Sequence, residues 1–157
     1  MAVAEHMTEM LGGKFLLYVN TGADEDTNLT WTKIGGQRKG TFGRTADVIK
    51  AQHKDSFPWY RKLQGYIQWT FDFDGVWLID SSTGIQDVGI KKMQELWTAQ
   101  EEAYIQLVVP MYDSAAGEGS TYTGHAIIAD FSLDGPHDNL ITYTGKLEGN
   151  GSYLYVE

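Results

Sequence analysis

The sequence predicts a mainly β domain, either a β-sandwich or a barrel, with one packed α-helix and one long protruding segment. Apolar and polar residues alternate with period two in several stretches, which is typical of half-buried strands. Eighteen glycines against three prolines indicate frequent tight turns. Aromatic residues make up 13% of the chain, too many for a disordered protein. At 157 residues the chain is expected to be a single domain, residues 1–157.

The clearest alternation lies in residues 66–73, where four large apolar residues share one face (Ile67, Trp69, Phe71 and Phe73). Asp74-Gly75 then predicts a tight hairpin into residues 76–79. Gly149-Asn150-Gly151 predicts a turn between the last two strands. The further strands expected from the pattern are residues 14–20, 29–34, 103–109, 121–133, 139–148 and 152–156.

The predicted helix covers about residues 85–99 and lies against the strands. Ser82 or Thr83 is expected to cap its N-terminus, and Asp87 is spaced to pair with Lys91 one turn later. Apolar residues recur at helical spacing, so four of them are expected to face the sheet (Ile85, Val88, Leu96 and Trp97). Residues 1–12 are interpreted as an N-terminal tail that is either flexible or ordered by assembly.

Basic residues are concentrated in one segment, residues 36–64. The chain has 12 Lys and Arg and 21 Asp and Glu; this segment holds seven of the basic groups and two of the acidic ones, leaving five and nineteen elsewhere. The segment is long for a loop and mixes large apolar groups with its charges, so we interpret it as a self-assembly arm rather than a solvated loop. Its expected contact residues are Arg38, Lys39, Phe42, Arg44, Lys50, Lys54, Phe57, Trp59, Arg61 and Lys62.

Composition argues against several functions. The net charge of −9 disfavours tight nucleic-acid binding, and the absence of cysteine excludes disulfides and thiolate metal sites. Apolar runs are too short to span a membrane. The acid pairs Asp72/Asp74 and Asp134/Asp138 suggest turns more than a glycosidase site, and the His125, Asp130, Asp134 and His137 set matches no metal-ligand spacing. We therefore expect no enzyme activity, no cofactor and no metal.

Several passages resemble the major tail proteins, or tail tube subunits, of long-tailed non-contractile bacteriophages. The resemblance is one of order and spacing and extends from about residue 14 to residue 151. The passages are residues 13–20 (GKFLLYVN), 31–38 (WTKIGGQR), 44–47 (RTAD), 54–55 (KD) with Trp59, 69–76 (WTFDFDGV), 122–124 (YTG) and 147–151 (LEGNG).

This resemblance implies a structural virion protein. Six copies would form a ring, the rings would stack helically into a hollow tube, and residues 36–64 would reach the neighbouring ring. Implied partners are other copies of the chain and the tape measure, tail terminator and distal tail proteins, with DNA passing through the lumen unbound and no membrane contact. The protein would be made in the host bacterial cytoplasm and would reside in the virion tail.

Strand alternation and the resemblance together suggest which residues line the tube. A polar, net acidic wall would let DNA slide, because lumenal Lys or Arg would hold phosphates. The favoured residues are Thr70, Asp72, Thr142 and Thr144. The alternative function is a β-barrel or sandwich module that binds a small ligand or a carbohydrate through its aromatic residues.

Overall fold

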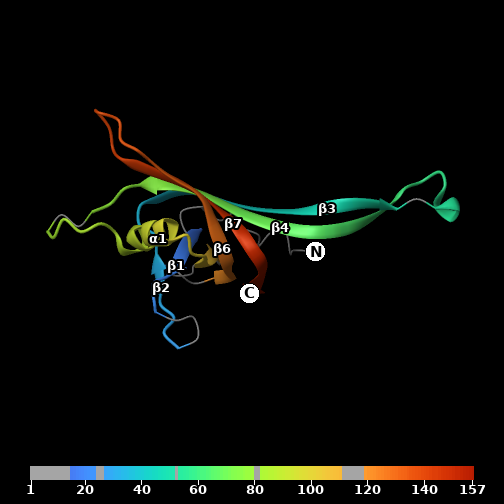
Figure 1. The fold of residues 1–157 in the computed structure, drawn as a ribbon, viewed down its shortest axis with the longest axis horizontal. Coiled ribbons are helices and arrows are strands. Elements are labelled where there is room, and N and C mark those ends of the chain that lie inside the picture. The colour runs from blue at the N-terminus through green and yellow to red at the C-terminus, as the bar shows by residue number, and fades with distance from the viewer. Residues whose placement is uncertain (1–14, 24–26, 52, 80–81, 111–118) are drawn as a thin grey trace, which may run out of the picture.

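The computed structural model describes residues 15–23, 27–51, 53–79, 82–110 and 119–157, so the predicted tail at residues 1–12 lies outside the described residues. The described part is mainly β with one helix, as predicted (Figure 1). Its elements in chain order are β1 (Leu16–Asn20), β2 (Trp31–Lys33), β3 (Gln37–Ala51), the 3-10 turn η3 (Lys54–Ser56), β4 (Arg61–Val76), α1 (Val88–Ala99), β5 (Ala103–Pro110), β6 (Gly119–Asp134) and β7 (Thr142–Val156).

The seven strands form one antiparallel sheet in the order β2-β1-β5-β6-β7-β4-β3. The sequence predicted a sandwich or a barrel, whereas the described strands all belong to this single sheet. Period-two alternation shows that a strand has a buried face, but it does not show what covers that face. Here α1 covers part of it, with contacts to β1, β2 and β6.

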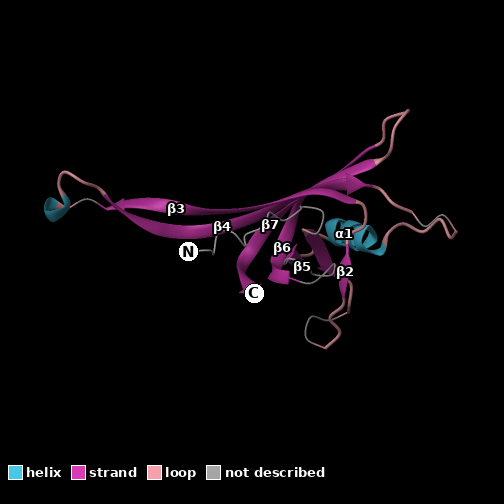
Figure 2. Cartoon of the chain, turned by 180° about the vertical axis from the view of Figure 1, so that it is seen from behind, coloured by secondary structure: helices cyan, strands magenta, loops and turns pink. Residues whose placement is uncertain are grey.

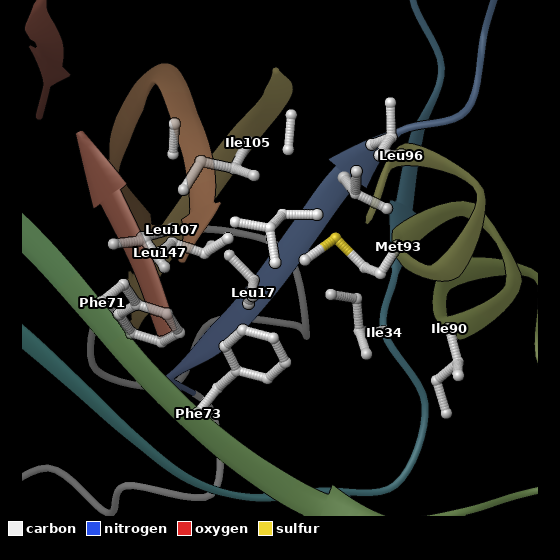
Figure 3. Packing of buried hydrophobic residues seen from close by; sticks show 14 of the residues in the cluster. Leu17, Ile34, Phe71, Phe73, Ile90, Met93, Leu96, Ile105, Leu107 and Leu147 are labelled. Carbon is white, nitrogen blue, oxygen red and sulfur yellow. The ribbon is translucent and has the colours of Figure 1, made fainter. Parts of the chain in front are cut away.

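The core lies between α1 and the inner face of the sheet. Met93 is fully buried and points from α1 into the cluster, beside Leu17 of β1 (Figure 3). Phe71 and Phe73 of β4 close the other side of the cluster, with ring centroids 6.2 Å apart. The cluster draws on five strands and the helix, which makes this body a well-packed unit.

The helix begins later than predicted, at Val88. Its cap is Asp87 rather than Ser82 or Thr83: Asp87 accepts hydrogen bonds from the backbone N–H groups of Gly89 and Ile90. The same carboxylate accepts from Gly35 N at 2.9 Å, which ties the helix to the turn before β3. The helix therefore buries Ile90, Met93 and Leu96, and the prediction that Ile85 and Val88 face the sheet is wrong; both are more than half exposed.

Two predicted turns are continuous strand. Asp74-Gly75 lies inside β4, and Gly149-Asn150-Gly151 lies inside β7. Glycine serves close packing at two of these positions, because a Cβ on Gly75 would lie 2.4 Å from Gly36 O, and one on Gly149 would lie 2.1 Å from the Trp69 ring. Gly151 has a φ of +89°, a conformation that glycine adopts without strain.

The most extended feature is the hairpin of β3 and β4, which projects far beyond the rest of the sheet (Figures 1 and 2). Strand β4 pairs with β7 only from Thr70 to Val76, whereas its pairing with β3 continues out to Ala51 and Arg61. We call residues 45–68 the outer hairpin and residues 53–60 its tip. At about 3.3 Å per residue, strand residues 45–51 alone project by about 20 Å. The predicted protruding segment is thus a long hairpin.

Candidate assembly surfaces

The outer hairpin exposes large apolar side chains along its length. A two-stranded ribbon has no second layer on either face, so residues of both alternation sets are exposed. Ile67 was predicted to share a buried face with Trp69, but it is 63% exposed, since it pairs only with Ala46 and no third strand flanks it. The exposed set is Val48, Ile49, Phe57, Trp59, Tyr60, Leu63, Tyr66 and Ile67.

The tip combines aromatic and basic groups. Phe57 and Trp59 are 82% and 80% exposed, the most exposed large apolar residues in the described chain apart from Tyr66 at 85%. Lys54 lies in η3, and Arg61 and Lys62 begin β4. Lys50 lies opposite Lys62 in the register, with its Nζ 5.7 Å from the centre of the Tyr60 ring. The structure thus brings six of the ten predicted arm residues together in the outer hairpin.

The other four predicted arm residues lie in the body of the sheet. Arg38 approaches Asp74 on the neighbouring strand, with Nη2 and Oδ2 3.8 Å apart. Lys39 pairs with Asp74 in the strand register. Phe42 and Arg44 belong to an aromatic cluster at the base of the outer hairpin, where Phe42 is half-buried and Arg44 is exposed.

This cluster, which we call the aromatic junction, fills the place where β4 and β7 diverge. It consists of Phe42, Trp69, Tyr122 and Tyr153, with the Arg44 guanidinium 5.2 Å from the Phe42 ring centre and 5.6 Å from that of Tyr122. Trp69 Nε1 donates a hydrogen bond of 2.9 Å to Gly151 O across the fork. A hydrogen bond to Tyr153 raises the pKa of Arg44.

The junction fixes the base of the outer hairpin. Four aromatic rings in edge and tilted contact supply packing beyond their buried area. Sequence analysis missed it because its members come from four strands that are distant along the chain. Gly149 leaves the space that the Trp69 ring occupies, but a glycine in the sequence does not show which side chain packs against it.

The residues predicted to line the lumen share the outer face of the sheet, opposite the core. Asp72 and Thr144 are exposed, and Thr70 and Thr142 are half-buried. The register aligns Thr70 with Glu148, Asp72 with Lys146, Asp74 with Thr144, and Val76 with Thr142. Strand β6 continues the face, because Asp130, Ser132 and Asp134 are opposite Lys146, Thr144 and Thr142.

This outer face is acidic overall. Its charged groups are those of Arg38, which reaches Asp74, and of Lys39, Asp72, Asp74, Asp130, Asp134, Lys146 and Glu148, which is three basic groups against five acidic ones. Lys146 lies between Asp72 and Asp130 in the register, and its Nζ is 4.0 Å from a Glu148 oxygen. Its charge is therefore balanced by neighbouring carboxylates.

The acid pair Asp134/Asp138 and the His and Asp set considered from the sequence do not come together as a site in the described part of the structure. Asp134 and Asp138 lie at the exposed β6–β7 turn, and His137 and Asp138 are almost fully exposed. His125 stacks on Tyr104, with ring centroids 4.6 Å apart. Within the described residues, no three His, Asp or Glu side chains are grouped so as to hold a metal ion. No helix in the described part of the chain is long and apolar enough to cross a bilayer.

Comparison with known proteins identifies the family. The model of the phage tail tube protein family matches residues 9–155, nearly the whole chain. Curated protein sequences include no match to this chain. The family assignment supports a structural role in a tail tube, with no enzymatic activity, and gives no support to the ligand-binding alternative.

Solved structures share the fold at low sequence identity. The tail of an empty gene transfer agent particle, refined with helical and C6 symmetry, is 16% identical with a TM-score of 0.73, over 95% of this chain and 100% of that one. The native gene transfer agent virion gives 15% identity and a TM-score of 0.71 over the same shares. The SPP1 tail tube is 12% identical with a TM-score of 0.63, over 91% of this chain and 77% of that one. The chain therefore belongs to the phage tail tube protein family and is a structural component of the virion tail.

Proposed function

We propose that this tail tube protein assembles as hexameric rings that stack helically into a hollow tube, and that the outer hairpin joins one ring to the next. The observation that carries the proposal is the exposure of Phe57, Trp59, Tyr66 and Ile67 on a ribbon that projects from the body. The C6 symmetry of the gene transfer agent tail, which shares the fold, supports six copies per ring.

The energetics of the hairpin support an assembly role. An isolated two-stranded hairpin is at best marginally stable in water, because neither of its faces is covered. Exposed apolar groups of this size on a protruding element favour a partner surface. A contact between unlike surfaces that repeats without closing produces a filament, as a tube requires.

The outer face supports a second part of the proposal, that Thr70, Asp72, Thr142 and Thr144 line the channel for DNA. A wall with more acidic than basic groups repels phosphates and does not retain them. The local carboxylates around Lys146 reduce its attraction for DNA. We further propose the tape measure, tail terminator and distal tail proteins as partners, and synthesis in the host bacterial cytoplasm before incorporation into the virion.

Electron microscopy of the purified chain, across a range of concentrations, tests the assembly proposal. We expect six-fold rings or hollow tubes whose length rises with concentration. A protein that remains monomeric at high concentration, and that is also absent from the tail of the assembled particle, would contradict it.

Asp72→Lys tests the lumen assignment. We expect particles with this substitution to assemble and to release DNA more slowly than wild type, because each ring would present additional positive charge to the phosphates. Asp138→Lys, at an exposed turn away from this face, is the matched control and should leave release unchanged. Wild-type release from particles that carry Asp72→Lys throughout the tube would remove Asp72 from the channel wall.

A further inference from the structure

A groove lies beside the C-terminal end of α1. Helix α1 lies in the body of the molecule, well away from the hairpin tip (Figures 1 and 2). The groove has a volume of about 740 Å³ and is open to solvent. Leu96 and Trp97 of α1, Glu101 and Glu102 of the following turn, and Ile127 and Ile128 of β6 line it.

The groove forms where helix α1 ends and strand β5 begins. Helix α1 stops at Gln100, which adopts the left-handed conformation with a φ of 58°, and Glu101 N donates to Leu96 O to close the last turn. Strand β5 begins at Ala103, opposite Ala126, so in the described chain β6 has no partner on that side beyond this residue. The helix end and this free edge enclose the groove.

The chemistry of the groove is an apolar floor with an acidic rim. Trp97 is 44% exposed, so the floor leaves an apolar side chain in contact with water. Ile127 pairs with Glu148 in the register, so its side chain lies on the outer face of the sheet at the edge of the groove. Glu101 and Glu102 are exposed at the rim, and Glu102 also accepts a hydrogen bond from Asn150 Nδ2. Such a groove fits a partner that presents an aromatic side chain flanked by basic groups.

The chain carries a segment with this chemistry at its own hairpin tip. Trp59 is 80% exposed and is followed closely by Arg61 and Lys62. The tip lies far from α1 in the same molecule (Figures 1 and 2), so it cannot contact the groove of its own chain. A contact between the tip of one copy and the groove of another is a head-to-tail contact that extends along one axis.

We propose that this groove receives the hairpin tip of a second copy, with Trp59 against Trp97, and with Arg61 and Lys62 facing Glu101 and Glu102. This inference rests on the proposed ring-to-ring role of the outer hairpin and specifies its receptor. The apolar contact supplies affinity, and the charges select the correct end of the partner.

Disulfide trapping tests the contact directly, because the native chain has no cysteine. Tyr60→Cys in one preparation and a tagged Thr98→Cys in another are mixed, assembled and mildly oxidised. We expect tagged mixed dimers to be the main product. Lys91→Cys, on the same helix but outside the groove, replaces Thr98→Cys as the control and should give only background dimers. Tubes that form with no excess of Thr98→Cys dimers over this control would overturn the groove assignment.

A charge exchange separates this inference from the function on which it rests. The pairs Glu101→Lys with Glu102→Lys, and Arg61→Glu with Lys62→Glu, should each abolish tube growth, and combining all four changes should restore it. Glu95→Lys with Asp138→Lys makes the same change in net charge outside the groove and should leave growth intact. Normal tubes from the Glu101/Glu102 variant, in salt conditions where removal of the outer hairpin prevents growth, would reject the groove and retain the hairpin's role. If tubes grow normally both from the Glu101/Glu102 variant and from the variant without the outer hairpin, the groove assignment and the assembly role of the hairpin are both rejected.

Discussion

The two halves of β4 share one alternating sequence but occupy different environments. In the inner half, Trp69, Phe71 and Phe73 are at most 4% exposed, because β7 flanks the strand and the core covers its face. In the outer half, Tyr66 is 85% exposed and Ile67 is 63% exposed, because only β3 accompanies the strand. The comparison separates residues that stabilise the folded subunit from residues that remain available to another copy.

The largest expected difference in stability is between two aromatic residues of this strand. Phe71→Ala should lower the free energy of unfolding by about 3–5 kcal/mol, because it leaves a cavity in the core. Tyr66→Ala should change it by less than about 0.5 kcal/mol, as for other exposed positions. Denaturant unfolding of the unassembled subunits measures both values. Similar losses for the two variants would mean that the outer hairpin is part of the cooperative core.

The sequence predicts the inner half of β4 better than the outer half. Alternation correctly placed most strands and indicated that Trp69, Phe71 and Phe73 are buried. It could not show where a flanking strand ends, so it extended the buried face to Ile67. Likewise, Gly75 and Gly149 resemble turn residues locally, but their role is to admit Tyr143 and Trp69, which come from distant parts of the chain.

The Asp87 carboxylate attaches helix α1 to the body, and its removal should have a smaller effect than Phe71→Ala. Asp87→Ala should lower the free energy of unfolding by about 1–3 kcal/mol, because it removes the helix cap and leaves Gly35 N without its acceptor. Asp138→Ala, at a position that is 94% exposed, is the control and should have little effect. Thermal melts of the two variants compare them. An unchanged melting temperature for Asp87→Ala would show that the carboxylate does not hold the helix in place.

A smaller, pH-dependent effect is expected at Tyr143, which is fully buried and donates a 2.8 Å hydrogen bond to Gly35 O. Burial, followed by the charges of Asp87 and Asp74, raises its pKa above the ordinary value of 10. Above pH 10 the unfolded chain therefore loses this proton while the folded chain keeps it. The free energy of unfolding should fall by about 1.4 kcal/mol per pH unit from this residue alone.

Tyr143→Phe isolates that contribution. The variant should be less stable than wild type at pH 8, because it lacks the hydrogen bond to Gly35, and its stability should decline less steeply above pH 10. Denaturant unfolding at several pH values gives the two slopes. Equal slopes would mean that Tyr143 ionises at the same pH in the folded and unfolded chains.

The assembly surfaces were predictable only in part. The clustering of charge in residues 36–64 located the hairpin, since composition along the chain needs no tertiary information. It did not show that Phe42 and Arg44 also pack within the chain, in the aromatic junction with Tyr122 and Tyr153; their predicted partner contact stays a prediction. The groove beside α1 could not be predicted, because it forms between the end of α1 and the part of β6 beyond Ala126 that β5 does not pair with, and only the folded chain brings these together.

We infer that the body folds by itself and that the outer hairpin serves assembly. Replacing residues 46–67 by Asn-Gly joins Thr45 to Gln68, which face each other in the register, through a two-residue hairpin turn. Electron microscopy of this variant shows whether tubes form, and denaturant unfolding shows whether the subunit folds. We predict a cooperatively folded subunit, with stability close to that of the wild-type monomer, that forms no tubes. Long tubes from the variant, or a subunit that no longer folds, would contradict this inference.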